Sequence, residues 1–194
     1  MQFLCKIFVG WLIKCNAIEN EDRELYEYAV NVLILTIAPL VLVMVIGLVT
    51  GWLYNGILLI LPFLIMRKFS GGFHARYASV CFILSVAVLI ICMYLTTVAV
   101  LDIRLNLCTV AALVSLAWNS PVDSQNRRLD QTEHVRYKHI MVGLAFAFGL
   151  LYFVLVILKY TQCAVCISTG IILTAFLQFL GVIKNAYGLR GSSR

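Results

Sequence analysis

The side chains best suited to covalent chemistry in this chain are the imidazole of His74 and the thiol of Cys81. A cysteine with a histidine as its base is a common nucleophile in peptide cleavage. The two residues are seven positions apart, so on a straight helix they would share a face with their Cα atoms about 10.5 Å apart, too far for a hydrogen bond. Gly71 and Gly72 can adopt backbone angles that are closed to other residues. We therefore expect this pair to let the loop with His74 fold back toward Cys81 at the start of a helix.

Three basic residues, Arg67, Lys68 and Arg76, lie close to this pair in the sequence. Cations and a helix N-terminus favour the thiolate form of a cysteine, whereas apolar surroundings leave the thiol inert. Spacing alone leaves a second interpretation open. In that interpretation Cys81 is a core residue, His74 is an interfacial polar residue, and the basic residues only orient the chain in a membrane.

A second polar segment, residues 119–139, combines turn formers such as Pro121 and Asn126 with a basic pair. We expect it on the same side of the membrane as the first segment. Asp123 is the candidate to orient His74, as a third group orients the base in other nucleophilic sites. The alternative is a solvated loop in which Asp123 caps its own turn.

The composition indicates an integral membrane protein. Of the 194 residues, 62% are hydrophobic and 12% are charged, whereas soluble domains have roughly half apolar and a quarter charged residues. The net charge of +6 is explained by basic residues in cytoplasmic loops, so we predict no nucleic-acid partner. Lys6 and Lys14 interrupt the first apolar run, so we expect no signal peptide to be removed.

The sequence predicts no metal site and no cofactor. His134 and His139 do not form an H-E-x-x-H motif, and no second pair or histidine completes a zinc site with Cys163 and Cys166. The seven cysteines are odd in number and lie mostly in apolar stretches. This pattern favours small buried hydrophobic residues over a disulfide framework.

The predicted fold class is an all-α integral membrane protein with a single membrane domain, residues 1–194. About six transmembrane helices are expected, at residues 29–49, 52–66, 78–101, 105–118, 140–158 and 163–183. The second and fourth segments extend only about 22 and 21 Å as helices, so these two are short for a hydrocarbon core of about 30 Å. Residues 1–27 are expected to form an amphipathic interfacial helix and an acidic turn.

The basic residues predict how these helices are oriented. With the N-terminus inside, six crossings place thirteen of the fifteen basic residues in the cytoplasm and leave Arg104 and Lys159 outside. Both termini, the loop 67–77 and the loop 119–139 are then cytoplasmic. In a four-span alternative the second and fourth segments dip and return, which would put residues 67–77 outside.

Around the candidate nucleophile the sequence resembles the AgrB (accessory gene regulator B) family of bacterial quorum-sensing peptide processors. The matching residues of the first polar segment are Arg67, Gly71, Gly72, Phe73, His74, Ala75 and Cys81. The chain length, the six apolar segments and the second loop with Pro121, Asp123 and Asn126 extend the resemblance over the whole chain.

The resemblance implies that His74 is the catalytic histidine and Cys81 the nucleophile, with Arg67 and Gly72 as supporting motif positions. Many relatives continue the second-loop motif from the asparagine to a proline, where this chain has Arg127. The further candidates for support or substrate contact are Lys68, Gly71, Arg76, Pro121, Asp123 and Asn126.

The resemblance also implies an activity in the bacterial cell membrane. A cysteine endopeptidase would remove the C-terminal part of an AgrD-like propeptide through a thioester on Cys81, and an internal cysteine or serine would then close a thiolactone or lactone. Relatives are expected to act as homodimers. One alternative is hydrolysis to a linear product. The other is a noncatalytic small membrane peptide exporter or binding protein, which would tolerate Cys81→Ser.

Overall fold

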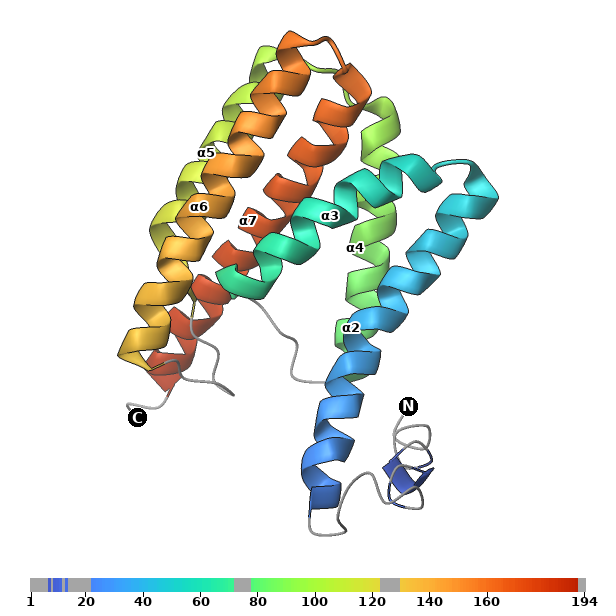
Figure 1. The fold of residues 1–194 in the computed structure, drawn as a ribbon, viewed down its shortest axis with the longest axis vertical. Helices are drawn as coiled ribbons and strands as arrows, with labels where there is room; N and C mark the ends of the chain where they lie inside the picture. Colours follow the sequence, from blue (N-terminus) through green and yellow to red (C-terminus); the bar gives the residue numbers. More distant parts are fainter. Residues whose placement is uncertain are drawn as a thin grey trace.

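The structure is a computed structural model that describes residues 7, 9–11, 13, 22–71, 78–122 and 130–191. Its long helices are α2 (Arg23–Thr50), α3 (Leu53–Ser70), α4 (Ala78–Val98), α5 (Ile103–Asn119), α6 (Gln131–Ile157) and α7 (Thr161–Gly191). Figure 1 shows that successive helices run in opposite directions between two ends of the molecule. We call the end with residues 51–52, 99–102 and 158–160 the turn end. The opposite end, with residues 70–71, 78, 119–122 and 130, is the loop end.

The helices are apolar enough to confirm the predicted all-α membrane fold. Four stretches have the length and composition of membrane spans: Leu53–Ser70, Val80–Val98, Gln131–Ile157 and Thr161–Lys184. Two shorter apolar stretches accompany them, Ile37–Thr50 within α2 and Ile103–Asn119. The protein is therefore a multi-pass membrane protein.

The second apolar segment is longer than the sequence predicted. A helix over 52–66 was expected to end at the first basic residue, but α3 continues through Arg67 and Lys68 to Ser70. Cations in the last turn of a helix are stabilised by the negative end of the helix dipole. The described helix ends at Gly71, whose φ of 67° and ψ of −158° are not helical.

Both expected loops are accordingly shorter than 67–77 and 119–139. The first begins after Ser70 and the second ends at Asp130, because α6 begins at Gln131. His134 and His139 therefore lie on α6. At the turn end, Asp102 caps α5 by accepting a hydrogen bond of 2.8 Å from the Leu105 amide.

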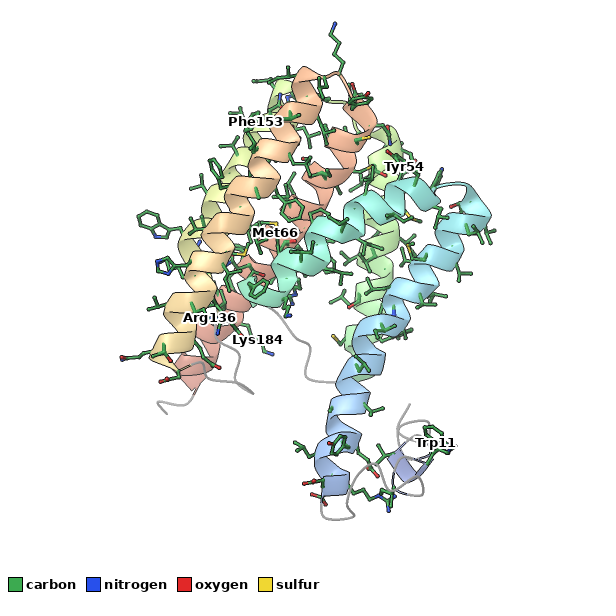
Figure 2. The ribbon with its side chains drawn as sticks, viewed as in Figure 1. Trp11, Tyr54, Met66, Arg136, Phe153 and Lys184 are labelled. Atoms are coloured by element: carbon green, nitrogen blue, oxygen red, sulfur yellow. The ribbon has the colours of Figure 1, made fainter. Side chains whose placement is uncertain are left out.

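The expected interfacial helix is described only at residues 7, 9–11 and 13, which are helical. Val9 is buried, whereas Trp11 is 58% exposed. Figure 2 shows Trp11 at the end of the molecule where α2 begins. The other residues of the 1–21 segment lie outside the described part of the chain, so the interfacial position stays a prediction.

Two apolar clusters hold the helices together, and α3 and α7 contribute to both. The first contains Met66 and Ile171 and joins α3, α5, α6 and α7, with Met66 near the centre of the view in Figure 2. The second contains Leu59 and Leu173 and joins α2, α3, α4 and α7. The two shared helices touch at Gly170, where an added Cβ atom would meet the carbonyl oxygen of Leu59. Small residues permit this approach of backbones in membrane helices.

Polar side chains form hydrogen bonds between the helices. The hydroxyl groups of Thr109 on α5 and Ser168 on α7 share a hydrogen bond. Asn55 donates to Thr96 Oγ1 at 3.2 Å, and Gln162 Nε2 donates to the Thr96 carbonyl oxygen at 2.9 Å. Such bonds keep buried polar atoms away from hydrocarbon and add specificity to helix packing.

Candidate active site

Cys81 lies in the first turn of α4, at the loop end, as the sequence predicted. Its thiol is free and its side chain is partly buried. The first turn of a helix carries backbone N–H groups without helical partners and the positive end of the helix dipole. This position therefore suits an anionic sulfur nucleophile.

Arg67 approaches the same place from the last turn of α3. Its Nη1 atom donates a hydrogen bond of 2.6 Å to the carbonyl oxygen of Gly71. Its guanidinium is also close enough to Cys81 for an electrostatic interaction. Arg67 thus links the end of α3, the start of the first loop and the candidate nucleophile.

The Lys68 side chain makes different contacts from the Arg67 side chain. The side chain is exposed, and its Nζ atom lies 5.5 Å from the centre of the Phe69 ring. Phe69 in turn packs edge-to-face against Tyr137 of α6, with ring centres 5.7 Å apart. The contacts described for Lys68 therefore lead toward α6 and not toward Cys81.

The two polar segments meet directly at Gly71 and Val122. The amide of Val122 donates a hydrogen bond of 3.0 Å to the carbonyl oxygen of Ser70, and Gly71 and Val122 form a short parallel β-bridge. Gly71 has φ 67° and ψ −158°, a conformation essentially confined to glycine. A Cβ atom on Gly71 would also collide with the carbonyl oxygen of Val122. Gly71 therefore has backbone angles that other residues disfavour, and the two polar segments lie at the same end of the molecule. Whether the glycine pair folds the loop with His74 toward Cys81 stays a prediction.

A hydrogen bond from α7 holds the start of the second loop in place. Ser120 ends α5 with an extended backbone, and both Ser120 and Pro121 are buried. Gln178 Nε2 on α7 donates a hydrogen bond of 2.7 Å to Ser120 Oγ. The Val122 contact described above is therefore two residues from a buried side-chain anchor.

Further cations lie at the loop end. Arg136 and Lys138 are exposed on α6, and Lys184 is half-buried on α7. Figure 2 shows Arg136 and Lys184 toward the end of the molecule where α6 begins. The loop end therefore carries basic side chains on α6 and α7 as well as on α3.

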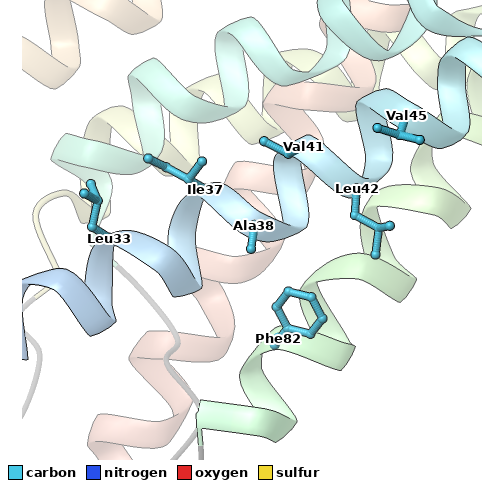
Figure 3. A pocket seen from close by; sticks show the side chains of 7 residues that line it. All are labelled: Leu33, Ile37, Ala38, Val41, Leu42, Val45 and Phe82. Atoms are coloured by element: carbon cyan, nitrogen blue, oxygen red, sulfur yellow. The ribbon is translucent and has the colours of Figure 1, made fainter. Parts of the chain in front are cut away.

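An apolar groove lies between α2 and α4 (Figure 3). It has a volume of about 550 Å³ and is lined by Leu33, Ile37, Ala38, Val41, Leu42, Val45 and Phe82. Phe82 follows Cys81 in the sequence, but no lining side chain can donate or accept a proton. The groove therefore does not compete with the loop end as a place for acid–base chemistry.

The other described cysteines lie away from this arrangement. Cys163 belongs to the turn end, where its Sγ atom is 3.3 Å from the hydroxyl oxygen of Tyr54. Among the described residues, no three His, Cys, Asp or Glu side chains gather as a metal site.

Comparison with known proteins identifies the family. The sequence profile described as accessory gene regulator B matches residues 5–180. The chain belongs to the AgrB family. It is 25% identical to an AgrB-like protein of Halalkalibacterium halodurans over 178 residues, which cover 90% of this chain and 82% of that protein. No solved structure matches the chain.

Two AgrB-like proteins of Clostridium perfringens are 30% identical over 70 residues, or 36% of this chain. These matches span 33%, about a third, of the length of those relatives. AgrB membership implies a part in accessory-gene-regulator quorum sensing.

Five candidate residues of this AgrB protein lie outside the described part of the chain: Gly72, His74, Arg76, Asp123 and Asn126. The pairing of His74 with Cys81 and the orientation of His74 by Asp123 therefore remain predictions. The described candidates Arg67, Gly71 and Cys81 are joined by the contacts above, and Pro121 lies beside the Val122 contact.

Sequence reasoning missed Gln178 in this AgrB protein. The sequence did contain a signal, an amide in the middle of an apolar run. Burying an amide in a membrane costs free energy, so such a residue is a candidate functional residue. What the sequence lacked was the partner, since Ser120 lies 58 residues earlier in the chain.

Proposed function

We propose that this protein is a membrane cysteine endopeptidase that cleaves the C-terminal part of an AgrD-like autoinducer propeptide and supports cyclisation of the product. The observation that carries the proposal is the free thiol of Cys81 in the first turn of α4, within electrostatic range of Arg67. AgrB membership supports the substrate class, a small quorum-sensing propeptide.

The proposed reaction begins when His74 takes the proton of the Cys81 thiol. The thiolate attacks the scissile carbonyl carbon, the carbonyl oxygen becomes an oxyanion, and the C–N bond then breaks. The leaving amine receives the proton from the imidazolium, so that the N-terminal part of the propeptide remains as a thioester on Cys81.

The thioester is then resolved by the substrate itself. An internal cysteine or serine of the propeptide attacks the thioester carbonyl, its proton passes to His74, and the Cys81 thiolate leaves. The product is a thiolactone or a lactone, and exclusion of water from the site favours this ring over a linear acid.

Positive charge gives the site its selectivity in this proposal. Arg67 is the charge that interacts electrostatically with Cys81, and its bond to Gly71 restricts its position. Lys68 and Arg76 would attract an acidic propeptide tail from the cytoplasm, so processing should weaken as salt rises above physiological strength. Asp123 would hold the imidazole of His74 in its productive orientation. A homodimer in the cell membrane is the proposed assembly.

The test uses purified protein in liposomes. The substrate is a synthetic propeptide from the neighbouring reading frame, with an amphipathic N-terminal part, a central cysteine or serine and an acidic tail. Cys81→Ala should abolish cleavage, while Cys92→Ala and Cys108→Ala should leave cleavage largely intact. Mass spectrometry should find a product lighter by one water than the linear acid.

Each other outcome selects an alternative. A linear product that depends on Cys81 would identify a hydrolase without cyclisation. Cleavage by Cys81→Ala protein would refute the nucleophile. Transport or binding of the propeptide without cleavage, unaffected by Cys81→Ser, would identify a noncatalytic exporter or binding protein.

A further inference from the structure

Gln178 is a buried amide in the apolar second half of α7. Its side chain is 1% exposed. Its Nε2 atom donates to Ser120 Oγ at 2.7 Å, but its Oε1 atom has no hydrogen-bond partner in the described part of the chain. An unsatisfied buried acceptor is destabilising, and an apolar side chain of similar volume would avoid that loss. The hydrogen bond that the described chain gives this amide is the one to Ser120.

The residue that Gln178 bonds, Ser120, is only two residues from the contact between the two polar segments. Ser120 is 2% exposed and ends α5 with an extended backbone. Two residues later the Val122 amide donates to the Ser70 carbonyl oxygen at 3.0 Å. The hydrogen bond to Ser120 thus restricts the direction in which the chain leaves α5 and pairs with Gly71 through Val122.

From this junction the contacts continue to the candidate nucleophile. The Gly71 carbonyl oxygen accepts hydrogen bonds from Arg67 Nη1 at 2.6 Å and from Ser70 Oγ at 3.1 Å. Arg67 interacts electrostatically with Cys81. A displacement of Val122 would move Gly71, and with it the carbonyl oxygen that holds the Arg67 guanidinium in place.

We infer that Gln178 is a positioning residue for the cysteine site, acting through Ser120 and Val122 on Gly71 and Arg67; its effect on cleavage rests on the proposed function. The competing role for a buried amide is general bundle stability, because interhelical hydrogen bonds stabilise membrane bundles. Gln162 on the same helix provides a comparison for that role. Its side chain is exposed, and its Nε2 atom donates a 2.9 Å bond to the Thr96 carbonyl oxygen at the turn end.

The first measurement is independent of catalysis. Hydrogen–deuterium exchange of the Val122 amide is followed in wild type, Gln178→Met and Gln162→Met protein in nanodiscs. Gln178→Met should speed exchange on the order of fivefold to tenfold, the factor expected for loss of one hydrogen bond, and Gln162→Met should leave it unchanged. Unchanged exchange in Gln178→Met would overturn the positioning role.

The second measurement follows cleavage of the synthetic propeptide described above. Gln178→Met should lower kcat on the order of fivefold to tenfold with KM unchanged, because substrate contacts remain while the Arg67 charge is misplaced. Ser120→Ala should cause a similar loss, and the double variant should lose no more than either single variant. A change in Val122 exchange with normal kcat would overturn the link to catalysis.

The proposed function can fail separately. Cleavage that survives Cys81→Ala overturns the nucleophile assignment, whereas the positioning of the loops by Gln178 is decided by exchange alone. Equal loss of kcat in Gln162→Met and Gln178→Met would overturn the inference in favour of general bundle stability.

Discussion

The amide of Val122 donates a hydrogen bond of 3.0 Å to the carbonyl oxygen of Ser70, and this bond joins the two polar segments at the loop end. The same contact brings the Val122 carbonyl oxygen so close to Gly71 that a Cβ atom has no room there. Residue 71 can therefore adopt its observed backbone conformation beside Val122 only as a glycine.

Gly71→Ala should consequently reduce propeptide cleavage by tenfold or more while the protein remains inserted in the membrane. The strain of a side chain in this backbone region is on the order of 1–3 kcal/mol, and the collision with Val122 adds to it. Relief of that strain would move the loop. Initial rates with purified protein in liposomes measure the effect.

Gly51 provides the control for Gly71, because it also has a positive φ, 78°, but an added Cβ atom would meet nothing within 4 Å. It lies at the turn end. Gly51→Ala should lower thermal stability slightly and leave cleavage near the wild-type rate. Normal cleavage by Gly71→Ala protein would contradict the importance of the junction.

Arg67→Lys should lower kcat by about tenfold to a hundredfold, the range for losing a hydrogen bond of a charged donor, about 1.5–3 kcal/mol. A lysine keeps the topology charge but cannot present the fork of donors with which a guanidinium can bond Gly71 and face Cys81 together. Lys68→Ala removes the adjacent charge, whose described contacts lead away from the sulfur. It should leave kcat nearly unchanged, and equal losses in the two variants would refute a specific role for Arg67.

The position of the candidate nucleophile could be predicted from the sequence, whereas the contacts around it could not. The glycine pair and the apolar run after it placed Cys81 at the head of a helix, and α4 begins three residues before it. The end of α3 was misjudged because a basic residue was taken as the boundary of an apolar helix. In the folded chain the Arg67 side chain continues past that boundary to the Gly71 carbonyl oxygen.

The contact between Gln178 and Ser120 could not have been predicted from either local sequence. Each residue alone is compatible with many partners, and their pairing depends on how α5 packs against α7. For the contact between Gly71 and Val122, the sequence predicted only that the two loops lie on the same side of the membrane. Its register is set by tertiary packing, in which α3 and α7 carry both apolar clusters.

His74→Ala should remove acyl-enzyme formation at neutral pH, and raising the pH should restore part of it. Higher pH generates thiolate without a base, so the variant regains the nucleophile but not the acid that protonates the leaving amine. Cys81→Ala should show no recovery at any pH. Trapping of the acyl-enzyme by mass spectrometry across a pH series tests this, and unchanged activity of His74→Ala at pH 7 would exclude His74 as the base.

The last prediction concerns the side of the membrane on which the loop end lies. Because most basic residues of the chain belong to this end in the six-span arrangement, it should face the cytoplasm, where reducing conditions keep Cys81 a free thiol.

The labelling positions must be exposed. Ser70 is unsuitable since it is 0% exposed, whereas Lys68 and Asp130 are exposed at this end and Lys159 at the other. Single cysteines at these three positions, in a background without native cysteines, are treated with a membrane-impermeant thiol reagent. Lys68→Cys and Asp130→Cys should be protected in intact cells and react once the membrane is opened, while Lys159→Cys should react at once. Reaction of Lys68→Cys in intact cells would place the site outside, and a cytoplasmic propeptide could not then reach Cys81 by the proposed route.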